Sequence, residues 1–132
     1  MPSDLHHLAL QWGRHPVEAF IVLGEGLRHA SRQADGKLRS GLDRHLSAAE
    51  LVQGVVDLMC ERCGLLAGAV LRSWGIHTAD DLGDLTFFLI EQGVLGKQEG
   101  DRREDFHHLP PLAEVIRERV REQLDRSLAA LP

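Results

Sequence analysis

Two cysteines separated by two residues, Cys60 and Cys63, form the segment of this sequence with the clearest potential for chemistry. Such a pair is half of a zinc site or a redox pair, and histidines are available as further ligands, notably His6-His7 and His107-His108. The pair falls inside an expected helix, however, and a structural zinc would need two more ligands from distant parts of the chain. Free cysteine is commonly a small buried residue, so we expect ordinary packing here and no cofactor.

A catalytic site brings a nucleophile, a base and an orienting group together, and no spacing in this sequence indicates such a set. The carboxylates of Asp80, Asp81 and Asp84 could hold a cation, but helix capping and a solvated face explain them better. We therefore expect no catalytic residues. An enzyme, or a metal site of unknown type at Cys60 and Cys63, stays open as an alternative.

The elements that would position these residues are mostly helices. Apolar residues recur at helical spacing after Pro16, and the turn signals that follow predict a basic loop over residues 28–46. Ser47-Ala-Ala-Glu50 is a capping box that starts a helix, and Thr78-Ala-Asp-Asp81 is a second box of the same kind.

Residues 71–106 read as a helix end, a turn, a capped helix and then a β-hairpin. We expect Val94-Leu95 as one strand, Gly96–Arg103 as the polar turn and Glu104–His107 as the returning strand. This order predicts a winged-helix-like unit. The predicted fold is therefore mainly α: a single domain over residues 1–110 with this helix-turn-helix and small β-hairpin, followed by a C-terminal amphipathic helix over residues 111–132.

The C-terminal helix carries an apolar stripe in which Leu112, Ile116, Val120 and Leu124 recur every four residues. A stripe of this kind must be covered. We expect a protein partner or self-association, and leave open that the helix packs on its own domain.

The net charge of −5 is concentrated in residues 77–106, where eight acidic side chains face three basic ones. The helix after Thr78 begins with aspartates, which a DNA phosphate backbone would repel. A nucleic-acid-associated protein remains the alternative, because cations lie in the loop 28–44 and in the wing; these are Arg28, Arg32, Lys37, Arg39 and Arg44, and Lys97, Arg102 and Arg103.

At 132 residues and 43% apolar composition, the chain has the properties of one soluble domain. It contains no apolar run near the roughly 20 residues that cross a membrane and no signal peptide, so we expect a cytoplasmic location and no membrane contact. With no catalytic motif, the sequence favours a non-catalytic protein-interaction or adaptor module.

Several segments in order resemble a family of small bacterial proteins of unassigned function, known mainly from planctomycetes and verrucomicrobia. The resemblance covers roughly residues 11–106 and implies no activity. Its segments are His15-Pro-Val-Glu-Ala-Phe20, His45-Leu-Ser-Ala-Ala-Glu-Leu51, Leu71-Arg-Ser-Trp-Gly-Ile76, Asp81-Leu-Gly-Asp-Leu85 and Gly93-Val-Leu-Gly-Lys-Gln-Glu-Gly-Asp-Arg-Arg-Glu-Asp-Phe106.

Overall fold

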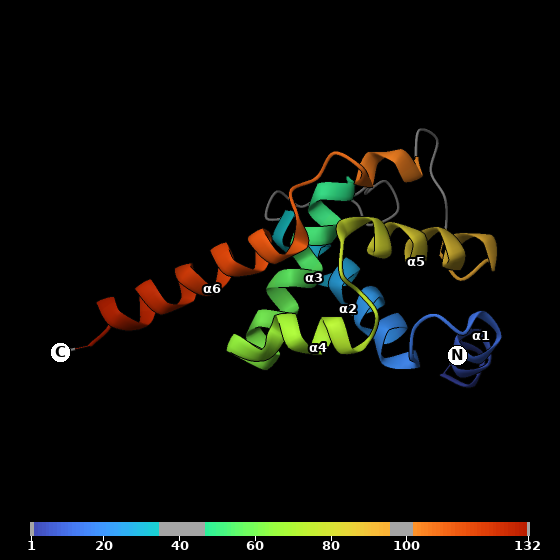
Figure 1. The fold of residues 1–132 in the computed structure, drawn as a ribbon, viewed down its shortest axis with the longest axis horizontal. Helices are drawn as coiled ribbons and strands as arrows, with labels where there is room; N and C mark the ends of the chain where they lie inside the picture. The colour runs from blue at the N-terminus through green and yellow to red at the C-terminus, as the bar shows by residue number, and fades with distance from the viewer. Residues whose placement is uncertain (1, 35–46, 96–101, 132) are drawn as a thin grey trace.

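The computed structural model describes residues 2–34, 47–95 and 102–131, and these residues form helices and turns without any β-strand (Figure 1). The longer helices are α1 (Pro2–Trp12), α2 (Val17–Ala34), α3 (Ala48–Cys63), α4 (Ala67–Ser73), α5 (Ala79–Glu91) and α6 (Leu112–Ala129). Two short 3₁₀ helices connect them: η3 (Gly64–Leu66) and η4 (Arg103–Phe106). The mainly α prediction is confirmed.

Both predicted capping boxes start helices as expected. The Ser47 hydroxyl accepts a hydrogen bond from the amide of Glu50, and the Glu50 carboxylate accepts one from the amide of Ser47. Thr78 and Asp81 make the same reciprocal pair at the start of α5. These bonds satisfy amides that the first turn of a helix leaves without partners, which fixes where α3 and α5 begin.

Helix α3 lies at the centre of the core and crosses α2 at very short range. A Cβ atom at Gly54 would lie 2.6 Å from the Cβ of Ala30 and 2.6 Å from the carbonyl oxygen of Gly26. A Cβ at Gly26 would lie 2.6 Å from a methyl of Val55. Glycine is therefore required at both positions, because any side chain would push the two backbones apart.

The predicted β-hairpin is wrong. Val94 and Leu95 do not extend as a strand, because their amides bond back to the carbonyl of Leu89 and close the end of α5. Gly93 adopts the left-handed conformation, with φ of 78°, that this helix termination requires. The expected turn falls largely in residues 96–101, which lie outside the described residues.

The expected returning strand is also absent. Residues 103–106 form η4, which places the Phe106 ring against Gly83 of α5, where a Cβ atom would lie 2.7 Å from that ring. Burial of Phe106 in the core thus replaces strand pairing. The winged-helix-like unit reduces to α4, a turn at Gly75 and α5.

The predicted basic loop is partly wrong, because α2 continues through Arg28 and Arg32 to Ala34. Arg28 is exposed on this helix. Lys37, Arg39 and Arg44 of that loop, and Lys97 of the predicted wing, lie outside the described residues.

Helix α1 is attached to the body through an aromatic contact. The Trp12 ring stacks on Phe88 of α5 with 4.4 Å between centroids and 7° between planes. Arg14 follows in the connection to α2, and its guanidinium binds Asp81 and Asp84 of α5. The first helix is therefore held against α5 by both stacking and charge.

Candidate interaction surface

Helix α6 has two halves with different surroundings. Leu112 in the first turn is only 2% exposed, and Ile116 and Val120 pack against the core, whereas Leu124 is 50% exposed. Leu128 and Leu131 are more exposed still. Figure 1 shows the same change, since the C-terminal part of α6 extends away from the other helices. The first half is therefore an internal brace and the second half is uncovered.

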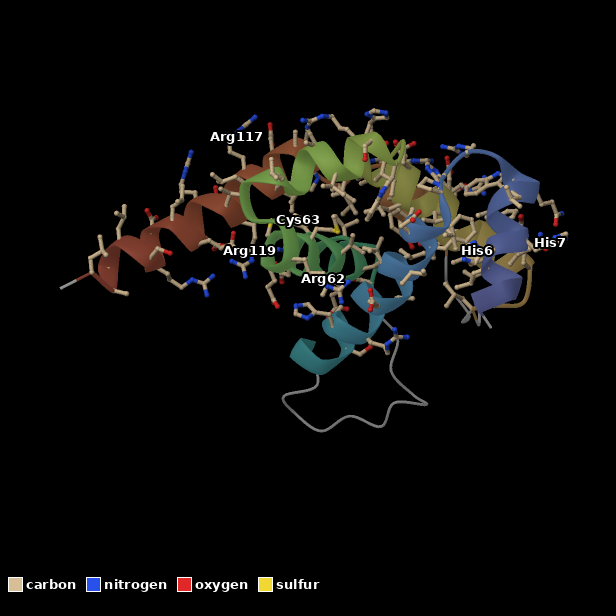
Figure 2. All side chains as sticks on the ribbon, turned by 90° about the horizontal axis from the view of Figure 1, so that it is seen from below. His6, His7, Arg62, Cys63, Arg117 and Arg119 are labelled. Carbon is tan, nitrogen blue, oxygen red and sulfur yellow. The ribbon has the colours of Figure 1, made fainter. Side chains whose placement is uncertain are left out.

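A polar contact fixes the first half of α6 on α3. The Nε of Arg119 donates a hydrogen bond to Oδ1 of Asp57 at 2.8 Å, and the side-chain amide of Gln53 donates one to the same oxygen at 3.0 Å. One turn further on, Gln123 donates to the carbonyl of Cys60 at 3.3 Å. Figure 2 shows Arg119 and Arg117 on opposite sides of α6, with Arg119 toward α3. These contacts end just before the exposed leucines begin.

The four-residue repeat of the predicted stripe explains this change of surroundings. An α-helix has 3.6 residues per turn, so positions four apart advance by roughly 40° around the axis each time. Over three steps from Leu112 to Leu124 the repeat moves from the core-facing side to solvent. The predicted stripe is thus not one surface: Leu112, Ile116 and Val120 pack within the chain, and Leu124 alone of the four is half exposed.

Two further leucines are exposed at the same end of the molecule. Leu65 and Leu66 form most of η3, which directly follows α3, and both are largely exposed. They lie between the last turn of α3, where the Cys60 carbonyl binds Gln123, and the first turn of α4, which packs on α6. We call Leu65, Leu66, Leu124, Leu128 and Leu131 the distal surface.

Arginines accompany the distal surface on both α4 and α6. The segment from Arg62 to Ala79 contains no acidic residue, and Arg72 on α4 is exposed. Arg117 is exposed on α6, and Arg121 is 3.9 Å from the carboxylate of Glu118, with both side chains mostly in solvent. Exposed arginines therefore lie beside the leucines, although α6 also carries the exposed acids Glu118, Glu122 and Asp125.

The other side of α6 forms an open polar groove with α3. Its volume is about 470 Å³, and its acidic edge has the four-residue spacing of one helix face. Among the residues that the structure describes, the lining side chains include no serine, cysteine or histidine. They are Gln53, Pro110, Glu114, Val115, Glu118, Arg119 and Glu122.

The cysteine pair lies at the end of α3 with its thiols in different surroundings. Cys60 is fully buried and Cys63 partly buried, and both are free. Burial raises the pKa of the Cys60 thiol. Figure 2 shows His6 and His7 at one end of the molecule, well away from Cys63. No three His, Cys, Asp or Glu residues within the described ranges are grouped to hold a metal ion.

The aspartates at the start of α5 are engaged in local contacts. Asp81 caps the helix and binds Arg14, while Asp84 binds Arg14 and Arg103. Asp80 pairs with His107. Of the cations expected in the wing, Arg103 thus forms an ion pair with Asp84 of α5, and Arg102 is exposed.

Sequence reasoning identified Leu124 but missed the other members of the distal surface. A usable signal was present, since Arg117, Arg121, Leu124 and Leu128 follow a spacing of four, three and four. That spacing keeps residues on one face of a helix, whereas a constant spacing of four does not. Leu65 and Leu66 gave no such signal, because η3 is too short to show a period.

The fold and site together define a small helical protein with a half-exposed C-terminal helix. Comparison with known protein families, with curated proteins and with solved structures found no match for this chain. No helix in the described parts of the chain is long and apolar enough to cross a membrane.

Proposed function

We propose that this chain is a non-catalytic protein-interaction module that binds a helical segment of a partner protein at the distal surface. The observation that carries the proposal is the exposure of Leu124 and Leu128 on a helix whose first half is firmly packed, with Leu131 exposed just beyond its end. Large apolar side chains grouped on a monomer commonly mark interaction sites, whereas single exposed leucines are ordinary.

The construction of α6 supports this role. The ion pair between Arg119 and Asp57 anchors the helix, so the exposed half is held in one orientation without contacts of its own. A preformed binding element loses less conformational entropy on association than a flexible one. Laying an apolar helix face against a partner helix is also a common recognition mode.

Surface variants would test the proposal. Changing Leu124 and Leu128 together to serine should leave the fold intact, because substitutions at exposed positions alter stability by about 0.5 kcal/mol or less. The matched control is Leu10→Ser, since Leu10 is 84% exposed on α1 and lies outside the distal surface. Each protein would be purified from its native cells and its co-purifying proteins quantified.

The expected result is a stoichiometric protein partner that is retained by the wild type and by Leu10→Ser, and lost from the double variant. The proposal is overturned if all three proteins retain the same set of molecules, or if none retains a protein.

A further inference from the structure

The exposed face of α6 changes character along its length. Arg117 and Arg121 occupy its first two positions, and Leu124 and Leu128 occupy the next two, at the alternating spacing of a coiled-coil seam. A partner helix that follows this seam meets cations at one end and leucines at the other.

The cations of this seam are poorly compensated within the chain. Arg117 forms no ion pair among the described residues, and the contact of Arg121 with Glu118 is long and solvated. Exposed pairs of that kind contribute little free energy. These guanidinium groups are therefore available to a partner's carboxylates.

Building on the proposed interaction role, we infer that the partner is an acidic amphipathic helix. Its apolar side chains lie opposite Leu124 and Leu128, and its carboxylates lie opposite Arg117 and Arg121. Arginine suits this task because its planar group can bind a carboxylate through two parallel hydrogen bonds.

A second copy of the chain fits this seam less well. Parallel pairing of two α6 helices would place Arg117 against Arg117 and Arg121 against Arg121, which is repulsive. Antiparallel pairing about Leu124 would set Leu131 of one copy against Arg117 of the other. An anionic membrane is also a weaker match, because α6 carries as many acidic as basic side chains.

Two synthetic helical peptides would test the partner class with the full chain. Both carry the same apolar seam; one has glutamate at both ends of that seam, so that either direction fits, and the other has lysine there. Binding would be measured by fluorescence anisotropy of a label on the peptide, at low and at high salt.

The glutamate peptide should bind roughly tenfold more tightly than the lysine peptide, with the difference shrinking at high salt. Changing Arg117 and Arg121 to glutamate should reverse the preference, and Leu124→Ser with Leu128→Ser should weaken both peptides. Circular dichroism of each variant checks that the fold is retained.

Equal binding of the two peptides would overturn the acidic partner and leave the interaction role standing. Failure of both peptides, with co-purification unaffected by the leucine changes, would remove both proposals. The acidic partner is likewise overturned if sedimentation shows a dimer that the leucine changes abolish, or if the protein floats with phosphatidylserine vesicles but binds neither peptide.

Discussion

The guanidinium of Arg119 on α6 and the carboxylate of Asp57 on α3 form an ion pair that is almost excluded from solvent, with side-chain exposures of 13% and 9%. The Nη1 atom of Arg119 is buried and has no hydrogen-bond partner among the described residues. The pair therefore joins the C-terminal helix to the central helix at a cost in desolvation, which good geometry only partly offsets.

Breaking this pair should be more harmful than replacing it. Arg119→Met would leave the Asp57 carboxylate buried without a cation, with only the hydrogen bond from Gln53, and should lower the free energy of unfolding by about 3 kcal/mol. Adding Asp57→Leu should recover much of the loss. Urea unfolding of both single variants and the double variant measures the coupling; strictly additive losses would contradict a functioning ion pair.

The close crossing of α2 and α3 predicts opposite effects at two glycines. Gly54→Ala should destabilise the protein by about 1–3 kcal/mol, because the new methyl overlaps Ala30 and the backbone of Gly26. Gly24→Ala is the matched control on the neighbouring helix, where the nearest atom would be the flexible end of Arg28 at 3.9 Å. It should stabilise by about 0.5–1 kcal/mol through helix propensity. Thermal unfolding would show the two melting temperatures moving in opposite directions.

The two thiols should react at very different rates. Cys60 is 1% exposed and burial raises its pKa, so it is poorly accessible and slow to form thiolate. Cys63 is partly exposed and should account for a single fast phase with Ellman's reagent in the native protein. In urea both should react. Cys63→Ala should remove the fast phase, and a fast phase that survives this change would mean that α3 opens around Cys60.

The surface pair of Glu25 and Arg62 should add a small stabilisation that disappears in acid. The hydrogen bond from Arg62 at 2.7 Å lowers the pKa of Glu25 below its ordinary value of 4.5. A lowered folded-state pKa means that the stabilisation is complete above the unfolded pKa, and is lost as the pH falls through the folded one. Glu25→Gln should therefore cost less than about 1 kcal/mol at pH 7. It should cost nothing at pH 2; an equal cost at both values would show that the charge does not matter.

The sequence allowed the helix starts to be predicted because a capping box is local: Ser47 and Glu50, or Thr78 and Asp81, satisfy each other over four residues. It misled at Val94 and Leu95, whose apolar character fits a strand equally well. Their amides instead donate hydrogen bonds to the carbonyl of Leu89 and end α5. The left-handed conformation of Gly93 and the packing of Phe106 on Gly83 favour this arrangement over a strand.

The distal surface was only partly predictable for a different reason. An apolar repeat indicates that a helix face is covered, but not by what. The first half of α6 packs on α3 and α4, with Ile116 beside Gly68, and this cover is lost by Leu124. The limit of that cover depends on tertiary packing, which no local pattern in residues 111–132 records.

The stacking of Trp12 on Phe88 gives the α1 end of this molecule an intrinsic fluorophore that the far end of α6 lacks. The chain has two tryptophans and no tyrosine, and α6 contains no aromatic residue. Trp74 follows the last turn of α4, whereas Leu65 and Leu66 precede its first. Intrinsic fluorescence therefore reports the release of α1 and global unfolding, whereas α6 contributes no fluorophore of its own to the distal surface. An emission shift on partner binding would mean that the surroundings of Trp12 or Trp74 change when the distal surface is occupied.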